Sequence, residues 1–413
     1  MSSSEDGRTG EAAKVCVVGS GSRFLSGISY YTNRLIHALA DEHEVSAILI
    51  RRLLPARLYP GRDRVGKRLT TFTYPAATKV FDGVDWYWGW SMIGALRFLS
   101  ARRPDIVVLQ WWSGTVLHTY LLLALFARAR GARIVMEFHE VLDTAELNIA
   151  PARWYVNSCV PLLIGMTDGF VVHNEFDRDL LEAHYGLVGK PVAIVPHGPY
   201  NQYAHASPPL RADDGICHLL YFGVIRPFKG VEDIVGALDA MDEQEAAKFH
   251  LTVVGETWEG WTTPGEMIAR SRYRDRIDFV NRYVTDEEVQ GFFDAADAAV
   301  LPYHRSSASG PLHLAMACGI AVVVTSVGGL VEAAEGYEGR VSVEPHRPDQ
   351  IRTALHRAWE LRRQRFQDTH SWDRTLARYN ELFAAIRPAG GSPASSRAHA
   401  DRAREGDGSA ISG

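Results

Sequence analysis

Short apolar runs alternate with segments of helical periodicity along most of this chain. In the first half the runs cover residues 14–18, 44–51, 105–110, 133–138, 169–173 and 192–196. Segments such as residues 28–40 and 117–130, whose apolar positions recur at helical spacing, lie between them. Strands that alternate with helices in this rhythm are typical of a parallel sheet covered on both faces. We therefore expect a doubly wound, Rossmann-like α/β domain in the first half.

The same pattern begins again in the second half. Its apolar runs cover residues 218–222, 249–254, 277–280, 298–301 and 321–325, with helical segments between them. Residues 206–215, rich in proline and charge, are typical of a linker. We expect disordered tails at residues 1–12 and 387–413, domains at 13–205 and 206–370, and a last helix at 371–386. Two such domains place a cleft between them, and ligands bind these sheets at the carboxyl ends of the strands.

Length and composition support this division. The 413 residues are too many for a single core. With 46% hydrophobic and 23% charged residues, the composition is that of an ordinary soluble protein. The formal net charge of -5 argues against nucleic acid as a partner. Residues 51–68 differ, since they hold many arginines and the single acid Asp63. A solvated loop explains this stretch better than a patch for an anionic lipid or acceptor, because it has no sustained helical period.

The cysteines, the N-terminus and the longest apolar run bear on the compartment. The four cysteines are widely spaced and form no C-x-x-C or Cys/His cluster, so neither a disulfide framework nor a zinc site is indicated. Residues 1–14 are polar and lack the apolar core of a signal peptide. The longest apolar run, residues 116–127, contains His118 and is too short to span a bilayer. We expect a cytoplasmic protein, with peripheral contact to an anionic inner membrane face left open.

The most informative segment is residues 221–230, Y-F-G-V-I-R-P-F-K-G. An apolar strand enters a turn at Gly223, which is followed by Arg226 and, three residues later, by Lys229. Glycines let a ligand approach the backbone, and two cations at the carboxyl end of a buried strand suit a diphosphate. For this motif taken by itself, a turn with two solvated cations is an equally good interpretation.

This segment resembles the donor-binding loop of the retaining GT-B glycosyltransferases of family four, which has the form Y-F-G-x-I-R-x-x-K-G. The resemblance extends from residue 14 to residue 386 and is densest between residues 221 and 332. It implies a GT-B fold, in which two Rossmann-like domains face each other across a cleft, and a nucleotide-sugar donor. It further implies that Arg226 and Lys229 neutralise the departing diphosphate.

A second resemblance lies between two predicted strands, in residues 305–319. The family has two glutamates here that align with Ser306 and Leu314, so both are missing, as they are in a subgroup of the family. Ser309 and Gly310 stand at a predicted helix start, with Pro311 well placed as the first helical residue. Their amides and the helix dipole are expected to hold a donor phosphate, although an ordinary serine-capped helix is the simpler interpretation.

Two shorter segments also resemble the family. N-R-Y-V-T-D-E-E-V matches a loop that lies near the nucleotide base in this fold, so its first residues, Asn281 and Arg282, are donor-binding candidates. Thr285 and Glu288 have the spacing of a capping box, which explains much of the segment structurally. V-G-G-L-V-E matches the family's V-G-G-x-x-E, in which Glu332 is either a cleft contact or an acid at a helix start.

A glycine-rich turn follows the first predicted strand. It supplies Gly19, Gly21 and, at the start of the next helix, Gly27. In the family such a turn offers N–H groups to an anion or to acceptor hydroxyls. A dinucleotide site is disfavoured, because the third glycine of G-x-G-x-x-G falls on Phe24 and the second strand ends in arginine rather than in an acid.

Three histidines, His139, His173 and His197, end predicted strands, where they can hydrogen-bond a sugar hydroxyl or a phosphate. His139 stands where the family often has a histidine facing the reaction centre, so we expect a catalytic role for it, whereas the other two are weaker candidates. Asp177 and Asp179 form a D-x-D pair at a helix start, where acids favour the dipole, so we expect no metal there. The tryptophans at positions 86, 88, 90, 111 and 112 are more typical of a core than of an acceptor or membrane contact.

The resemblance implies a glycosyltransferase that moves a hexose from a UDP- or GDP-sugar to a glycan, glycolipid or lipid-linked acceptor, with retention of configuration and without a metal or other cofactor. No side-chain nucleophile is expected, since the leaving phosphate itself can take the acceptor proton. Two alternatives remain open. One is a sugar-nucleotide epimerase on the same fold, and the other is a GT-B-like binding subunit that lost catalysis together with its glutamates.

Overall fold

The computed structural model describes residues 12–23, 27–53, 55, 72–141, 150–187, 189–200, 213–258, 260–306 and 308–387. Most of the predicted tails, of the basic stretch 51–68 and of the linker 206–215 lie outside these ranges. Within the basic stretch, the described Arg51 forms an ion pair with the buried Asp85, so its charge is used inside the domain.

The first domain is built on a parallel sheet. Its strands are β1 (Lys14–Ser20), β2 (Glu44–Arg52), β3 (Lys79–Asp85), β4 (Ile106–Trp111), β5 (Arg133–Phe138), β6 (Gly169–Val172) and β7 (Val192–Ile194). Its helices are α1 (Gly27–Ala40), α2 (Gly89–Arg102), α3 (Leu117–Arg128), α5 (Ala150–Met166) and α6 (Glu175–Tyr185), with a short 3-10 turn η3 (Gly114–Val116). Among the described residues the strand order is β3-β2-β1-β4-β5-β6-β7.

The second domain repeats this plan. Its strands are β8 (Cys217–Phe222), β9 (Phe249–Val254), β10 (Ile277–Val280), β11 (Ala298–Leu301), β12 (Ala321–Thr325) and β13 (Arg340–Val343). Its helices are α7 (Val231–Asp239), α8 (Glu243–Ala246), α9 (Thr263–Arg270), α10 (Asp286–Ala295), α11 (Gly310–Ala317), α12 (Gly329–Ala333) and α13 (Pro348–Leu361), with 3-10 turns η5 (Pro227–Lys229) and η6 (Arg274–Arg276). The described strands follow the order β10-β9-β8-β11-β12-β13, all parallel.

The predicted pair of doubly wound sheets is confirmed, and two edge strands are additions. In β3 the apolar residues are interrupted by Asp82 and Gly83, and burial is complete only at its last two residues. β13 has four residues, of which Val343 alone is buried. A strand at the edge of a sheet packs against fewer neighbours, so it needs no continuous apolar run. Among the described edge strands, β7 and β10 were predicted from the sequence together with the central strands, and only β3 and β13 were missed.

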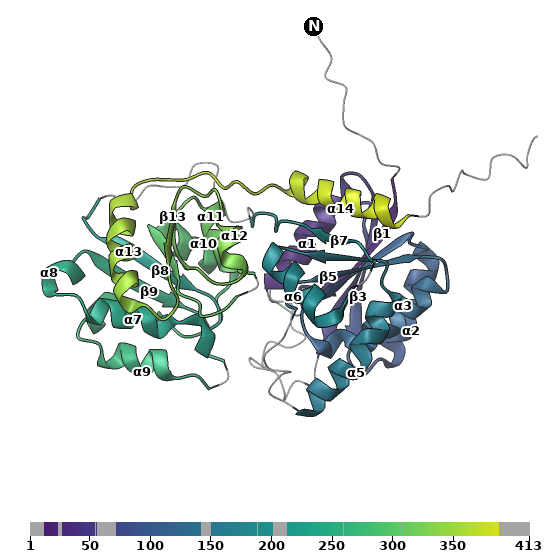
Figure 1. Ribbon diagram of the computed structural model, residues 1–413, viewed down its shortest axis with the longest axis horizontal. Coiled ribbons are helices and arrows are strands. Elements are labelled where there is room, and N and C mark those ends of the chain that lie inside the picture. The colour runs from purple at the N-terminus through teal and green to yellow at the C-terminus, as the bar shows by residue number, and fades with distance from the viewer. Residues whose placement is uncertain are drawn as a thin grey trace, which may run out of the picture.

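The chain returns to the first domain through its last helix, α14 (Trp372–Ile386), the long yellow helix above α1 and β7 in Figure 1. Trp372 donates a hydrogen bond from Nε1 to the carbonyl oxygen of Pro199 at 2.9 Å. A Cβ added to Gly198 would lie 2.3 Å from the Trp372 ring, so this packing requires glycine at that turn. The segment that follows β7 is thus held between the two domains.

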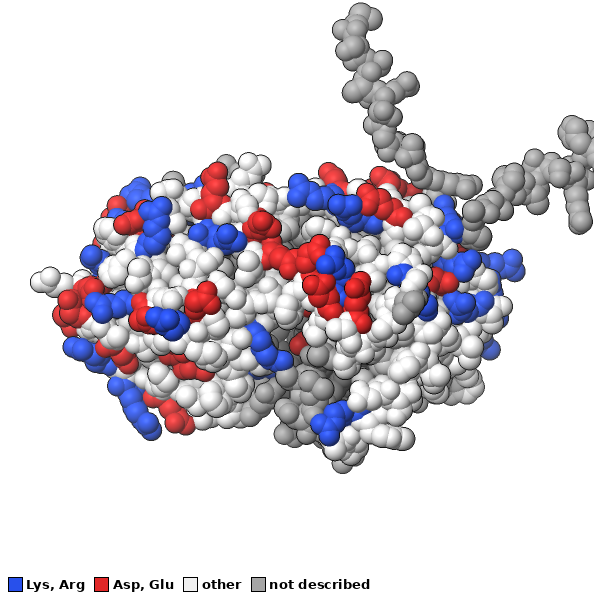
Figure 2. All heavy atoms as spheres, viewed as in Figure 1, with Lys and Arg blue, Asp and Glu red and all other residues white. Residues whose placement is uncertain are grey.

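The described surface is mixed in charge. On the face shown in Figure 2, lysine and arginine are interspersed with aspartate and glutamate over both domains, rather than gathered into the broad basic surface that nucleic acid binding needs. All four cysteines are free thiols. Within the described parts of the chain, every helix is too short or too polar to cross a membrane.

Candidate active site

The strand β8 ends in the turn that carries the two predicted cations. Arg226 precedes the 3-10 turn η5, and Lys229 ends it. Gly230 follows with φ of 63°, and a Cβ at this position would lie 2.0 Å from the carbonyl oxygen of Pro302. Glycine is therefore required here by both conformation and space. The close approach holds the turn against the segment that follows β11.

Lys229 is a cation in an unfavourable environment. Its side chain is partly buried, and its Nζ lies 3.5 Å from the centroid of the Tyr303 ring. Burial is the main cause that lowers the pKa of the ammonium to about 7; Glu140 opposes this effect, and the nearby Arg226 and Arg305 contribute to it. A bound dianion would stabilise the protonated form, so the site is poised for an anionic ligand.

The two neighbouring arginines lie against aromatic rings. The guanidinium carbon of Arg226 is 5.1 Å from the centroid of the Trp258 ring, and that of Arg305 is 4.3 Å from the centroid of the Phe228 ring. Aromatic faces hold guanidinium groups in place. We call Arg226, Lys229 and Arg305 the cationic wall. Arg305 was not singled out by the sequence analysis.

The helix α11 begins beside this wall. Ser309, 2% exposed, caps it, since its Oγ accepts a hydrogen bond from the amide of Leu312 at 3.3 Å. Gly310 is the first helical residue, so Pro311 stands second and not first as predicted. The Oγ of Ser309 is also 3.5 Å from the hydroxyl of Tyr303, the ring that carries Lys229. Tyr303 therefore contacts both the cap of the predicted phosphate-binding helix and one of the predicted cations, Lys229.

Tyr200 joins the predicted acceptor turn to this helix. Its hydroxyl donates to the carbonyl oxygen of Gly27, the first residue of α1, at 2.9 Å. A Cβ added to Gly310 would lie 3.5 Å from the Tyr200 ring. The N-termini of α1 and α11, one from each domain, therefore meet at a single buried ring. The sequence analysis missed Tyr200, because a tyrosine just after H-G-P matches no motif. Its position beyond the carboxyl end of β7 is the one signal that could have found it.

The two glycines predicted in the first turn have packing roles, and Gly19 lies in β1 rather than in the turn that follows it. A Cβ on Gly19 would lie 2.2 Å from Oε1 of Gln110 and 3.0 Å from Oγ1 of Thr32. A Cβ on Gly21 would lie 3.0 Å from the Leu49 side chain. Contacts within the domain account for both residues, while their predicted contact with a ligand stays a prediction.

Two donor-binding candidates have side chains that are engaged with the protein. The Oδ1 of Asn281 accepts hydrogen bonds from the amide of Thr257 at 2.9 Å and from its hydroxyl at 3.0 Å. Arg282 forms an ion pair with Glu288, and its hydrogen bonds hold the pKa of that carboxyl at about 2. The capping box between Thr285 and Glu288 is confirmed. The side chains therefore shape this loop, and its backbone is left as the group that can face a nucleotide base.

Glu332 contacts the other domain. It lies in the first turn of α12, and its carboxylate accepts hydrogen bonds from the amides of Glu175 at 2.6 Å and Phe176 at 3.1 Å. These amides belong to the first turn of α6, where the helix dipole favours an anion. Both sequence interpretations, a helix-start acid and a polar contact at the cleft, describe part of this arrangement.

Opposite the cationic wall, the ends of β5, β6 and β7 bring three histidines together. The ring centroids of His139 and His173 are 5.0 Å apart, and those of His173 and His197 are 5.2 Å apart. Tyr31 of α1 packs against all three rings. We call these four residues the histidine wall. Glu140, the residue after His139, raises the pKa of Lys229, so the end of β5 lies near the cationic wall.

The histidine wall continues into the second domain. His313 of α11, 1% exposed, stacks on His197 with 4.5 Å between ring centroids and 15° between ring planes. Burial lowers the pKa values of His139, His197 and His313 well below the ordinary range, and the neighbouring histidines add to this effect. These rings are therefore neutral at physiological pH, whereas the opposite wall carries arginines. The sequence analysis missed His313, because its partner His197 is distant in the sequence.

The remaining sequence candidates lie outside this cleft. Asp177 is 1% exposed and bonded to the helix cap Asn174, so it has the helix-start role that was favoured, whereas Asp179 lies beyond the first turn of α6 and pairs with Arg178 at 2.7 Å. Trp111 and Trp112 are buried, as expected of a core, but Trp90 is 84% exposed.

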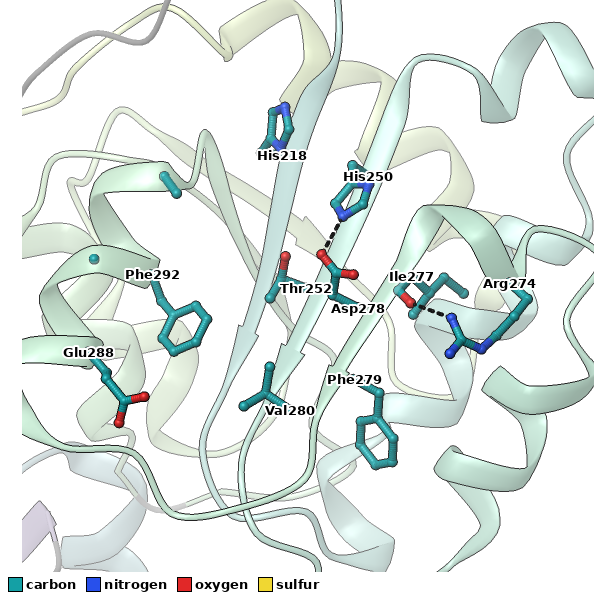
Figure 3. A pocket seen from close by; sticks show the side chains of 12 residues that line it. His218, His250, Thr252, Arg274, Ile277, Asp278, Phe279, Val280, Glu288 and Phe292 are labelled. Carbon is teal, nitrogen blue, oxygen red and sulfur yellow. Dashed lines mark hydrogen bonds and ion pairs between the residues drawn. The ribbon is translucent and has the colours of Figure 1, made fainter.

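A surface groove in the second domain is separate from the cleft (Figure 3). It lies over strands β8 to β10 beside α10, all four residues of β10 line it, and His250 and Asp278 hydrogen-bond within it at 2.8 Å. The cationic wall instead follows the carboxyl end of β8, where ligands of such sheets bind.

Comparison with known proteins agrees with this geometry. Residues 26–198 match the model of a glycosyl transferase 4-like domain, and residues 217–360 match the model of glycosyl transferases group 1. Similar sequences include D-inositol 3-phosphate glycosyltransferases of Nocardiopsis dassonvillei, 26% identical over 247 residues and 54% of this chain, and of Actinosynnema mirum, 27% identical over 289 residues and 64% of this chain. The matched stretches span 57% and 67% of those relatives, and 46% of the protein from Streptomyces bingchenggensis, so the chain spans about half the length of some relatives it matches.

Solved structures extend the comparison over nearly the whole chain. Sucrose-phosphate synthase of Thermosynechococcus elongatus has a TM-score of 0.64 at 15% identity, covering 90% of this chain and 100% of that one. The catalytic domain of starch synthase IV of Arabidopsis thaliana, bound to ADP and acarbose, has a TM-score of 0.65 at 14% identity, covering 91% and 99%. At such low identity these similarities show the fold, which is the two-domain GT-B arrangement.

Proposed function

Because this chain belongs to the group 1 glycosyltransferases of the GT-B fold, we propose that it is a retaining hexosyltransferase, which moves a sugar from a nucleoside-diphosphate sugar to an acceptor hydroxyl. The observation that carries this proposal is the cationic wall at the carboxyl end of β8. Its Lys229 has a pKa lowered to about 7 by burial and by the two neighbouring arginines, as expected of a site that needs an anion to complete it.

The cationic wall acts on the leaving group. Negative charge grows on the diphosphate as the bond to the sugar breaks, and cations already in place stabilise that charge more in the transition state than in the ground state. The capped N-terminus of α11, supported by Tyr303 beside Lys229, adds backbone N–H groups and a helix dipole. The acceptor hydroxyl enters from the histidine wall, and the departing phosphate takes its proton.

We propose that the transfer needs no metal, because arginine and lysine supply the positive charge. Extensive treatment with EDTA should leave turnover within about twofold of the untreated enzyme, a change too small for the loss of a charged catalytic group. Strong inhibition that Mn²⁺ or Mg²⁺ reverses would contradict this part of the proposal.

The relatives' names suggest a first acceptor to test. They are called D-inositol 3-phosphate glycosyltransferases, so a phosphorylated cyclitol is the first choice for this chain, with glycans, glycolipids and lipid-linked sugars as the others. The donor is a UDP- or GDP-sugar. Among the solved neighbours, an Anabaena protein called HepE was crystallised with UDP and glucose, at 13% identity and a TM-score of 0.58.

The decisive experiment measures donor binding first and chemistry second. A nucleotide sugar that is a true donor should raise the melting temperature by mass action in a panel of UDP-, GDP- and ADP-sugars. The same donor should then release nucleoside diphosphate slowly by hydrolysis and faster with the right acceptor. Binding without any turnover would indicate a non-catalytic subunit, and conversion of the donor to an isomeric sugar nucleotide would indicate an epimerase.

One face of the first domain supports a lipid-linked acceptor. Large apolar side chains are exposed there on α2, α3 and α5: Trp90 is 84% exposed, Trp154 72%, Leu162 61% and Leu125 59%. These helices pack side by side, and they carry four arginines and no acid: Arg97, Arg102, Arg128 and Arg153. Arg128 forms an ion pair with Asp168 just after α5, so the basic character comes from the other three. Aromatic and basic side chains together suit an anionic membrane surface.

Vesicles with anionic lipid should bind the protein more strongly than neutral vesicles, and Trp90→Ala should weaken that binding. Equal binding to both vesicle types would contradict the proposal.

A further inference from the structure

A chain of hydrogen bonds in the histidine wall begins at a carbonyl group. The Nδ1 of His173 lies 3.0 Å from the carbonyl oxygen of Val195, just beyond β7. A carbonyl oxygen can only accept a hydrogen bond, so this Nδ1 carries a proton. The Nε2 of a neutral His173 ring is then an acceptor. The His173 side chain is 2% exposed, which leaves the ring little freedom to turn.

The second link joins the two histidines. The Nε2 of His173 is 3.1 Å from the Nδ1 of His139. Because Nε2 of His173 is the acceptor, Nδ1 of His139 is the donor and carries the single proton of that ring. The Nε2 of His139 therefore has a free lone pair. Within the described part of the chain, this buried nitrogen has no hydrogen-bond partner.

The position of His139 indicates that the lone pair on its Nε2 can accept a hydrogen bond from a ligand. His139 directly follows β5, at the carboxyl edge of the sheet where ligands bind. Its ring packs on His173 and, through His197, on His313 of α11. The N-terminal cap of that helix contacts Tyr303 beside Lys229. A neutral imidazole in such a cleft can accept a hydrogen bond from a hydroxyl group but cannot donate one from Nε2.

We propose that His173 is a positioning residue that fixes His139 in the tautomer protonated on Nδ1, so that Nε2 of His139 accepts a hydrogen bond from a substrate hydroxyl. The tautomer itself follows from the hydrogen-bond chain, whereas the nature of the hydroxyl rests on the proposed function. That hydroxyl belongs either to the transferred sugar or to the acceptor.

The same atoms offer a competing arrangement. Oε1 of the fully buried Glu137 lies 3.7 Å from Nε2 of His173, and these two atoms and one nitrogen of His139 lie within 4.8 Å of one another, as ligands of a metal ion would. A metal bound there through Nδ1 of His139 would need the lone pair of that nitrogen. A proton and a metal therefore exclude each other at this atom, and the two arrangements can be told apart by experiment.

The direct test is a long-range proton–nitrogen correlation spectrum of the full chain labelled with ¹⁵N-histidine, recorded at pH 8. His139→Gln and His173→Gln, each made singly, assign the two rings. We expect both rings in the Nδ1-protonated form, and we expect His173→Leu to shift His139 toward the other tautomer. Protonation of His139 on Nε2 in the unaltered protein would overturn the proposal. Saturable binding of Zn²⁺ that both Gln variants abolish would also overturn it.

The second test uses turnover and separates positioning from folding. His173→Leu removes the acceptor for Nδ1 of His139 and should lower kcat/KM by about 10- to 100-fold, the range expected when a reacting group is misplaced. In His173→Gln the amide oxygen can still accept that proton, so the activity should be largely restored. Equal losses in both variants at equal melting temperatures would overturn the proposal.

These two tests fail in different ways. If the chain transfers no sugar at all, the unaltered protein shows no turnover, and the spectrum still reports the tautomer. A loss seen in donor hydrolysis as well as in transfer assigns the hydroxyl to the sugar, whereas a loss confined to transfer assigns it to the acceptor. A loss in neither reaction with His173→Leu would overturn the proposal.

Discussion

The two walls of the cleft are built in opposite ways. The cationic wall comes largely from one turn, in which Arg226 and Lys229 are three residues apart and Arg305 joins them from the segment after β11. The histidine wall comes from the ends of three strands and one helix, its rings pack closely against one another, and burial lowers the pKa values of His139 and His197. One wall holds charge that an anion must balance, while the other holds uncharged hydrogen-bonding groups.

This difference matches the two halves of a sugar transfer. The leaving diphosphate gains negative charge, so the groups that stabilise it must stay positive and be fixed beforehand. Sugar and acceptor hydroxyls stay neutral until late in the reaction, so they are better held by neutral groups of defined geometry. The contrast therefore predicts that charge matters on one wall and hydrogen-bond direction on the other.

The largest effect is expected from the cationic wall. Arg226→Ala and Lys229→Ala should each lower kcat/KM by about 100- to 1,000-fold, as the loss of one group that stabilises the transition state does in other enzymes. The melting temperature should change little, since Lys229 is desolvated at a cost to the fold. Steady-state kinetics with the donor found in the thermal-shift panel, together with melting curves, measure both quantities.

Lys248 provides a matched control for this prediction. It too lies near an aromatic ring, with Nζ 5.2 Å from the centroid of Trp359, but it precedes β9 at the end of the sheet away from the cleft. Lys248→Ala should keep activity within about twofold, as expected for a surface substitution. Near-normal turnover in either cleft variant, or equal losses in all three, would refute the role assigned to the cationic wall.

The next effect is on the pH dependence of binding. Lys229 in the free protein loses its proton as pH rises through about 7, because burial lowers its pKa from 10.5. An anion binds the protonated form, so the Kd of the nucleoside diphosphate should rise above pH 7, by at most about tenfold per pH unit. Between pH 7.5 and 9 the terminal phosphate, with a second pKa of about 6, does not titrate.

Calorimetry in buffers of different ionisation enthalpy checks this sign directly. Binding at pH 8 should take up a fraction of a proton per site in the unaltered protein. Lys229→Arg keeps its charge over this range and should flatten the profile. A Kd that is constant or falls between pH 7.5 and 9 would show that Lys229 is protonated throughout, and the comparison between the walls would then rest on the arginines alone.

A third prediction concerns Gly19 in β1, which packs against Gln110 and Thr32. In Gly19→Ala the new methyl group would meet Oε1 of Gln110 at 2.2 Å, so we expect a loss of about 1–3 kcal/mol in the free energy of unfolding. That corresponds to several degrees in melting temperature, at about 2–4 °C per kcal/mol. Gly165→Ala is the control, since nothing lies within 4 Å of its Cβ position. An unchanged melting temperature with weakened ligand binding would assign Gly19 to the ligand instead of to packing.

The two walls also differ in how far the sequence predicts them. The cationic turn is a contiguous motif, so its strand, its glycines and both of its cations were predicted by residue number. The histidine wall was predicted in part, because a histidine at a strand end is visible in the sequence. Its partners were not predicted: Tyr200 and His313 meet these rings from segments whose spacing carries no signal. Contacts of this kind are set by the docking of two domains and not by local pattern.

The same reasoning explains the uncertain candidates. Asn281 and Arg282 were chosen by resemblance, and the structure shows their side chains bound to Thr257 and Glu288. A motif can be shared because it shapes a loop as well as because it touches a ligand, and the sequence by itself does not separate the two. The edge strands β3 and β13 were missed because their apolar runs are broken, by Asp82 and Gly83 in β3 and by Ser342 in β13.

The smallest effect is expected where the walls are held together. Glu332 accepts two amide hydrogen bonds at the start of α6, across the domain boundary. Glu332→Gln keeps one acceptor oxygen and loses the charge, so we expect the contact to weaken by about 1 kcal/mol and kcat/KM to fall about fivefold. If Glu332 holds the domains together, the Kd of the nucleoside diphosphate should stay unchanged while scattering or inter-domain fluorescence shows a more open population. If Glu332 instead binds the donor, that Kd should rise and the domain distance should stay constant, and the cleft would then have a third, acidic contact that belongs to neither wall.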